Sequence, residues 1–106
     1  MVNDHSIKEL TERIAREFHP EKIILFGSHV SGSAGEDSDV DLLVILPFEG
    51  QAIRKSAEIL RKVQPRIPVD LIVRTPDYVR ERLKWNDFFL REIMERGKTL
   101  YESSHH

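Results

Sequence analysis

Two carboxylates that could act together stand two residues apart at the start of an apolar segment. Asp39 and Asp41 flank Val40, and residues 40–46 read Val-Asp-Leu-Leu-Val-Ile-Leu, a pattern typical of a buried strand. Residues two apart in a strand point to the same face, so these carboxylates should project side by side. Because two close anions repel each other, they favour a bound cation, and Mg²⁺ or Mn²⁺ prefers oxygen ligands of this kind. We therefore expect a divalent-cation site at Asp39 and Asp41.

A third acid interrupts the next apolar segment. Asp70 stands in Pro-Val-Asp-Leu-Ile-Val over residues 68–73, where an unpaired charge is unfavourable. If this strand lies beside residues 40–46, Asp70 can complete a cluster of three carboxylates. Taken alone, Asp70 is better explained as an edge-strand residue facing water. We expect the remaining nearby acids, Glu36 and Asp37, to form a solvated acidic turn.

A glycine-rich loop precedes the acid pair. Gly27 and Ser28 directly follow the apolar segment 23–26, and Gly32 and Gly35 come next. Glycines let backbone amides approach an anion closely, and a short helix starting near Ser28 would add free N–H groups. Many glycine-rich loops are only turns, so the prediction of an anion site depends on the position of this loop just before Asp39 and Asp41. The order predicts a phosphate-binding loop at Gly27 and Ser28.

Three other motifs are excluded residue by residue. A Walker A loop requires Lys after its second glycine, whereas Ser33 and Ala34 follow Gly32. A calcium-binding EF-hand beginning at Asp37 would need Gly in place of Leu42 and Glu in place of Phe48. No window contains the dinucleotide-binding pattern G-x-G-x-x-G.

The elements that must position these residues alternate between strands and helices. Apolar runs predict buried strands at 23–26, 40–46 and 69–73, and Leu100 and Tyr101 suggest a short final strand. Helical segments separate the strands. We therefore predict an α/β (α+β) fold in which helices pack against a small mixed β-sheet.

Caps and apolar spacing predict four helices. The first opens with the capping box Ser6-Ile7-Lys8-Glu9 and ends at His19-Pro20, and its apolar stripe is Ile7, Leu10, Ile14 and Phe18. The second spans residues 51–63, with Ile53, Ala57, Leu60 and Val63 on its inner face. Thr75-Pro76 starts the third, and Asp87 caps the last, which Gly97 stops.

Composition narrows the classes of protein. The 106 residues predict one domain over 1–106, with 103–106 as a tail or tag remnant whose His105 and His106 have no metal role. The net charge of −2 indicates no general attraction to nucleic acid or membrane. The absence of Cys and of a bilayer-length apolar run favours the cytoplasm. The basic residues Arg54, Lys55, Arg61, Lys62 and Arg66 predict a solvated helix surface, or a contact for an acidic partner or RNA.

Together, Gly27-Ser28, Gly32, Ser38-Asp39-Val40-Asp41-Leu42 and the lone acid of the next strand resemble the signature of the DNA polymerase β-like nucleotidyltransferase superfamily. The chain length and the ending Gly97-Lys98-Thr99-Leu100-Tyr101-Glu102 resemble its minimal nucleotidyltransferase (MNT) domains. The similarity extends from about residue 23 to residue 101.

The resemblance implies transfer of a nucleoside monophosphate, such as AMP from ATP, to an acceptor hydroxyl with two Mg²⁺ ions, for which Mn²⁺ can substitute. Asp39 and Asp41 would bind both ions and the triphosphate. Asp70 would complete the site of the catalytic ion and assist deprotonation of the acceptor. Gly27 and Ser28 would hold the β- and γ-phosphates, and Ser38 would belong to the nucleotide-binding segment.

The resemblance also implies a partner, because MNT domains are often antitoxins of helical HEPN-type toxins, and adenylylation of the toxin has family precedent. We expect the acceptor in trans, as a protein partner in a homo- or hetero-oligomer. Trp85, Phe88 and Phe89 could contribute to its surface, although at least two should belong to the core.

One departure weakens the prediction of catalysis. His29 stands where family members often carry Arg or an aromatic residue, and Ser31 stands where they often carry Arg; we expect His29 to be an exposed loop residue. Two alternatives therefore remain: an MNT-like antitoxin that acts by binding alone, and a subunit of a small-molecule nucleotidyltransferase.

Overall fold

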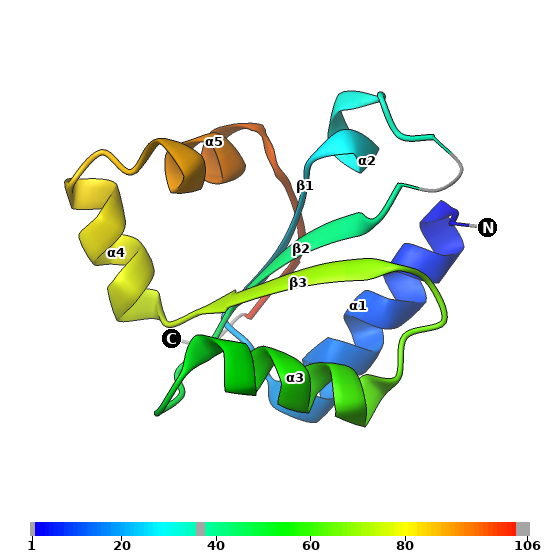
Figure 1. Ribbon diagram of the computed structural model, residues 1–106, viewed down its shortest axis with the longest axis horizontal. Helices are drawn as coiled ribbons and strands as arrows, with labels where there is room; N and C mark the ends of the chain where they lie inside the picture. Colours follow the sequence, from blue (N-terminus) through cyan, green and yellow to red (C-terminus); the bar gives the residue numbers. More distant parts are fainter. Residues whose placement is uncertain (1, 36–37, 104–106) are drawn as a thin grey trace.

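A four-stranded mixed sheet with helices on both faces forms the domain, as predicted. The computed structural model describes residues 2–35 and 38–103, so Glu36, Asp37, His105 and His106 lie outside the described residues. The elements are α1 (Asp4–Phe18), β1 (Lys22–Phe26), α2 (Ser28–Ser31), β2 (Val40–Ile45), α3 (Ala52–Val63), β3 (Val69–Arg74), α4 (Pro76–Lys84), α5 (Phe88–Arg96) and β4 (Lys98–Glu102). In Figure 1, α1 and α3 lie on one side of the sheet, α4 and α5 lie on the other, and α2 stands at one end.

The strand order β3-β2-β1-β4 places the two acid-bearing strands next to each other. β1 is antiparallel to both β2 and β4, whereas β2 and β3 are parallel and are joined through α3. The first residues of β2 and β3 therefore meet at the end of the sheet where β1 finishes. This end carries Asp41, Asp70 and Gly27.

Alternation along the strands divides the apolar side chains between two cores. In β2, Val40, Leu42 and Val44 pack with α1 and α3, whereas Leu43 and Ile45 pack with α4 and α5. This two-sided burial explains why the central strands are continuously apolar. Asp41 shares the face of Leu43, so it lies on the α4–α5 side of the sheet.

Helix α1 begins at Asp4, two residues before the predicted capping box. Asn3 is the N-cap, because its Oδ1 accepts a hydrogen bond of 2.8 Å from the Ser6 N–H. The expected role of Ser6 as the cap was therefore wrong, since Asn3 caps the helix and Ser6 lies in its first turn. The predicted apolar stripe is confirmed, with Ile7, Leu10 and Ile14 buried.

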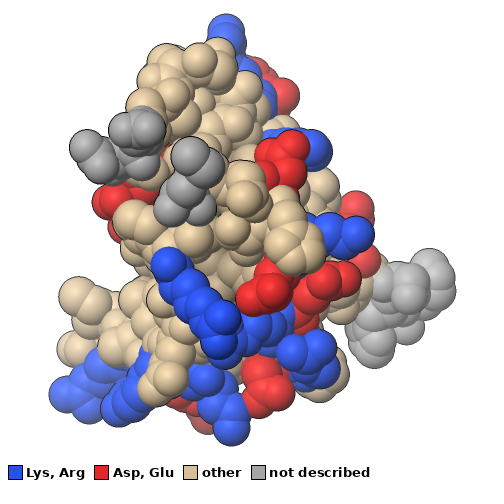
Figure 2. Space-filling view, turned by 90° about the vertical axis from the view of Figure 1, so that its right-hand side faces the viewer, with Lys and Arg blue, Asp and Glu red and all other residues tan. Residues whose placement is uncertain are grey.

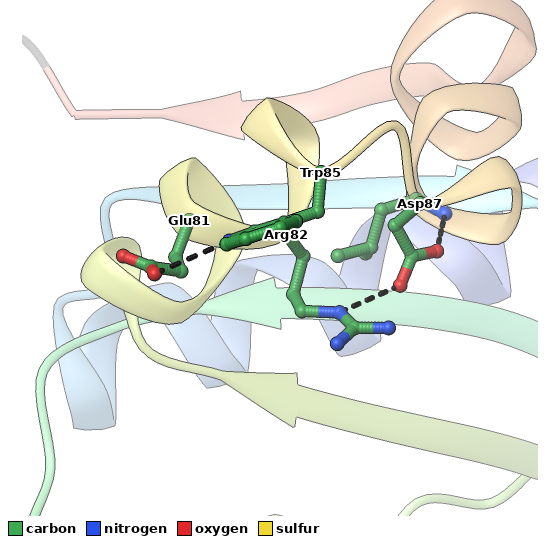
Figure 3. A network of polar contacts seen from close by, with 5 residues as sticks. Glu81, Arg82, Trp85 and Asp87 are labelled. Carbon is green, nitrogen blue, oxygen red and sulfur yellow. Dashed lines mark hydrogen bonds and ion pairs between the residues drawn. The ribbon is translucent and has the colours of Figure 1, made fainter.

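The caps predicted for α4 and α5 are confirmed. Thr75 Oγ1 accepts from the Tyr78 N–H at 3.1 Å, and Asp87 Oδ1 accepts from the Leu90 N–H at 3.0 Å. Asp87 Oδ2 also accepts from Arg82 Nε at 3.0 Å, so one carboxylate joins the two helices (Figure 3). Asp87 thus fixes where α5 begins relative to α4.

The inner face of α3 differs from the prediction. Ile59 and Val63 are buried and Leu60 packs beside them, whereas Ile53 is 76% exposed and Ala57 is also exposed. The helix is rotated because Ser56 faces the sheet and donates a hydrogen bond of 3.0 Å to the carbonyl of Leu71. A polar residue that the prediction left outside the inner face thus faces the sheet.

Three aromatic residues expected largely in the core are exposed instead. Trp85 is 73% exposed, Phe88 79% and Phe89 52%. The burial stripe of α5 runs through Leu90 and Ile93, which leaves the two Phe residues of the first turn outside it. The α4–α5 corner therefore presents an apolar surface, which we call the aromatic corner and define by Trp85 and Phe88.

Charged side chains of both signs cover much of the surface. Figure 2 shows Lys and Arg gathered toward the lower edge of one face, with acidic residues among them. Of the basic residues predicted at the surface of α3, Lys62 pairs with Glu17 at 3.5 Å and Lys55 pairs with Glu58 at 3.3 Å. Across residues 2–35 and 38–103, no helix is long and apolar enough to cross a membrane.

The predicted final strand is confirmed as β4. Ser103, expected in the tail, continues the structure, because its N–H donates to the carbonyl of Glu21 at 2.9 Å. Residues 104–106 lie outside the described part, so the expectation for them stays a prediction.

Candidate active site

Asp41 and Asp70 are register partners on the parallel strands β2 and β3. Each is the second residue of its strand, and each follows a valine that pairs with the other valine. Asp39 precedes β2 by one residue, two positions from Asp41 along an extended segment. The strand of Asp70 does lie beside β2, which was the condition for a shared acidic cluster, and Asp70 is also exposed on an edge strand, as its alternative interpretation expected.

Gly27 brings the loop against this acidic end. Its neighbour Phe26 is the register partner of Asp41 in β1, and at Gly27 the chain turns with φ of +79°. A Cβ atom at this position would overlap Oδ2 of Asp41. Only glycine satisfies both the backbone angle and the close approach. Helix α2 starts at the next residue, Ser28, as the sequence predicted.

The acidic side chains repel one another at this end of the sheet. Asp41 is half-buried, whereas Asp39 and Asp70 are exposed. Burial raises the pKa of the Asp41 carboxyl above its usual value, and the negative charges of Asp70 and Asp39 raise it further. His29 partly opposes this effect, because its ring lowers the pKa of Asp41. Positive charge is therefore favourable at this place.

The donor chemistry suits a hard cation such as Mg²⁺. All three acids offer carboxylate oxygens, and Mg²⁺ characteristically takes one or two protein carboxylates together with phosphate oxygens. In the described part of the chain, no three His, Asp or Glu side chains gather closely enough to form a metal-binding group. The three acids share one end of the sheet but do not converge on a single point.

The loop that leads to Asp39 is held by His29 and Ser38. Nε2 of His29 lies 3.1 Å from the carbonyl oxygen of Ser38, and Oγ of Ser38 accepts from the Gly35 N–H at 2.9 Å. The expectation that His29 is a freely exposed loop residue was wrong, since it is half-buried and contacts the segment before β2. The sequence did not predict this contact, because the partner of the His29 ring is a backbone carbonyl nine residues away.

Sequence reasoning missed a groove that begins at Gly27. It has a volume of about 520 Å³ and runs between α2 and α5, with Phe89, Glu92 and Arg96 on the α5 side. The opposite wall includes Val30 and Ser31 of α2. No local motif marks these α5 residues, because only the fold brings α5 beside the glycine loop.

The family model of the nucleotidyltransferase domain matches residues 7–100 of this chain. The chain belongs to the nucleotidyltransferase domain family. The match covers both acid-bearing strands and the glycine loop. This family membership confirms the resemblance that the motif predicted and makes the domain a nucleotidyltransferase.

Relatives of this nucleotidyltransferase agree with the assignment. The chain is 29% identical to a candidate protein adenylyltransferase of Methanocaldococcus jannaschii, over 95% of this chain and 100% of that protein. A crystal structure of a candidate nucleotidyltransferase from Sulfolobus solfataricus shares the fold with a TM-score of 0.57 and 28% identity, over 69% of this chain and 67% of that one.

A toxin–antitoxin structure solved with AMP-PNP has the same fold. Its TM-score is 0.56 at 22% identity, over 92% of this nucleotidyltransferase and 74% of that chain. At this identity the comparison establishes the shared fold alone.

Proposed function

We propose that this nucleotidyltransferase transfers AMP from ATP to a hydroxyl group of a partner protein, and that the partner is a HEPN-type toxin. Asp39 and Asp41 hold Mg²⁺ together with the triphosphate, and Asp70 completes the site. Gly27 and Ser28 bind the β- and γ-phosphates through backbone N–H groups at the start of α2. Ser38 sets the approach of the chain to Asp39.

The reaction is an in-line displacement at the α-phosphorus. The acceptor oxygen forms a new P–O bond, pyrophosphate leaves, and Asp70 accepts the proton of the acceptor hydroxyl. Mg²⁺ held by these carboxylates would neutralise charge that develops on the phosphate oxygens. The protein's own contribution is to position the two reactants and to exclude unproductive orientations.

One observation carries this proposal: Asp41 and Asp70 are register partners on adjacent parallel strands, beside a glycine at which a Cβ atom would overlap the Asp41 carboxylate. The pKa of Asp41, raised by burial and by its acidic neighbours, supports a site that favours a cation. The relative named as a candidate protein adenylyltransferase supports AMP as the group transferred and a protein as the acceptor.

The aromatic corner supports a protein partner. Trp85 and Phe88 expose most of their surface, and such large apolar side chains are typical anchors of protein interfaces. The corner lies on the same side of the sheet as the acids, so a bound protein could present a hydroxyl toward them. The toxin–antitoxin structure solved with AMP-PNP supports this class of partner.

The test is incubation of the protein and the product of its neighbouring gene with ATP and Mg²⁺, followed by intact mass measurement. We expect the neighbour to gain the mass of one or more AMP groups. The gain should disappear with EDTA and with Asp39→Ala or Asp41→Ala. Asp70→Asn should abolish transfer while leaving ATP binding within a few-fold, since this residue acts on the acceptor.

The second candidate function is neutralisation by binding alone. Two observations favour it: the aromatic corner is exposed, and neither His29 nor Ser31 supplies the guanidinium that phosphate recognition favours. In this case the combined variant Asp39→Ala, Asp41→Ala still neutralises the toxin and no mass change occurs. Trp85→Ser would then abolish neutralisation, whereas the acid variants would not.

A further inference from the structure

A groove between α2 and α5 continues from the proposed phosphate loop. Gly27, which closes against Asp41, is also one of its lining residues, so the groove and the acidic end of the sheet share a wall. A triphosphate held at Gly27 and Ser28 would therefore lie beside this groove. The volume, about 520 Å³, lies within the range of small-molecule pockets.

The groove walls are apolar and partly aromatic. Phe89 of α5 packs edge-to-face on Phe26 of β1, with ring centroids 5.9 Å apart and an interplanar angle of 88°. This contact orients the ring, yet Phe89 remains 52% exposed. Val30 and Ile93 add aliphatic surface. An oriented and half-exposed ring in such a groove is suited to stacking on a planar heterocycle.

Two polar side chains stand in the same groove. Glu92 and Arg96 are one helical turn apart on α5, with Arg96 Nε 3.8 Å from Glu92 Oε1. The carboxylate can accept a hydrogen bond from an amino group, and the guanidinium can donate to a ring nitrogen or carbonyl. A nucleobase presents both kinds of group along one edge.

We infer that the groove between α2 and α5 binds the base of the donor nucleotide, a purine stacked on Phe89 with its polar edge toward Glu92 and Arg96. This inference rests on the proposed function, because the triphosphate must be held at the glycine loop. It adds a determinant of nucleotide affinity outside the motif that defines the family. Helix α5 would then recognise the base while the loop and the acids recognise the phosphates.

The test compares binding of Mg·ATP with binding of Mg·tripolyphosphate, which carries the phosphates but no nucleoside. Isothermal titration calorimetry of the wild-type protein should show ATP binding at least ten-fold more tightly. Phe89→Leu keeps an apolar side chain against Phe26 but removes the ring. It should reduce the difference to about three-fold or less, with tripolyphosphate binding unchanged.

The chain supplies matched controls. Phe88→Leu changes the adjacent phenylalanine, which does not line the groove, and should leave both affinities unchanged. The pair Arg91–Glu95, 3.5 Å apart, repeats the spacing of Glu92–Arg96 on another side of α5. Glu92→Ala with Arg96→Ala should therefore weaken ATP binding several-fold, whereas Arg91→Ala with Glu95→Ala should not.

Each outcome is decisive. If wild-type protein binds ATP and tripolyphosphate equally, or if Phe88→Leu and Phe89→Leu have the same effect, the base site is overturned while the proposed function stands. If neither compound binds in the presence of Mg²⁺, the phosphate site fails and the base site falls with it. Circular dichroism and thermal unfolding of Phe89→Leu establish that the variant folds.

Discussion

Gly27 lies so close to Asp41 that any side chain at its position would overlap the carboxylate. The two residues belong to different segments, one directly after β1 and the other within β2, and the antiparallel pairing of these strands brings them together. The loop and the acid pair therefore form one unit.

Gly27→Ala should impair both folding and nucleotide binding. The new methyl group must displace Asp41, and the alanine must also adopt a φ of +79°. We expect destabilisation of at least about 1 kcal/mol and loss of most Mg·ATP binding. Thermal unfolding and calorimetry measure the two effects.

Gly32→Ala is the matched control for backbone strain. Gly32 has a similar φ of +85°, but a Cβ there would meet nothing within 4 Å. This variant should lose comparable stability from strain yet retain ATP binding. Equal loss of binding in both variants would contradict a role for the contact between Gly27 and Asp41.

Asp41→Asn should make the protein more stable at neutral pH and less able to bind Mg·ATP. Burial and the nearby acids raise the pKa of Asp41 in the folded state, so its ionised form opposes folding. This unfavourable contribution is absent below the usual value near 3.8 and develops as pH rises through the raised pKa. The Tm of Asp41→Asn should exceed that of the wild type at pH 7, and the gap should close on acidification.

The measurement is thermal unfolding from pH 3 to pH 8 in buffer containing a chelator. Glu12→Gln, which removes one charge from the exposed side of α1, serves as the control for net charge. If the difference in Tm between Asp41→Asn and the wild type stays constant with pH, the stabilisation does not come from removing the charge of Asp41.

Ser56→Ala should weaken the outer edge of β3. The carbonyls of Pro68 and Arg74 accept hydrogen bonds from the β2 side. Because carbonyls alternate in direction along a strand, those of Leu71 and Val73 face outward. Ser56 Oγ donates a hydrogen bond of 3.0 Å to the Leu71 carbonyl. Loss of this hydrogen bond should reduce stability by about 1 kcal/mol, or roughly 5 °C in Tm. Ser33→Ala, at an exposed loop position, should have no such effect.

Size-exclusion chromatography checks a second consequence of Ser56→Ala. An unsatisfied outward carbonyl on an edge strand offers a place for another chain to pair. Arg74 Nη1 still occupies the Val73 carbonyl at 2.8 Å, so any increase in self-association should be small.

Ser56 also shows where prediction from the sequence stops. The three strands, the caps at Thr75 and Asp87 and the positions of the site acids follow from local patterns, because each depends on a few adjacent residues. The inner face of α3 could not be predicted in this way. Ile53 and Ile59 both fit a helical stripe that includes Val63, and packing against the sheet decides that Ile59 is buried. Burial of Ser56 depends on Leu71, fifteen residues away.

The groove on α5 was beyond sequence reasoning for a similar reason. Phe89 acquires its orientation from Phe26, and Arg96 lines the same groove as Gly27 only because α5 packs beside β1. Aromatic residues in the first turn of an amphipathic helix predict core packing. Here the burial stripe begins one residue later, at Leu90.

The start of α5 depends on Asp87. The ionised carboxylate of Asp87 should stabilise the fold, whereas that of Asp41 opposes folding. The Leu90 N–H bonded to its carboxylate is the main cause that lowers the pKa of Asp87, and the hydrogen bond from Arg82 adds to it. A lowered pKa means that the ionised group stabilises the fold at neutral pH and that this stability is lost as pH falls through the lowered value.

Asp87→Ala should therefore reduce Tm by several degrees at pH 7, more than Arg82→Ala, because it removes the cap as well as the ion pair. Thermal unfolding should show the gap between Asp87→Ala and the wild type narrowing on acidification. If Arg82→Ala were as destabilising as Asp87→Ala, the ion pair rather than the helix cap would hold α4 and α5 together.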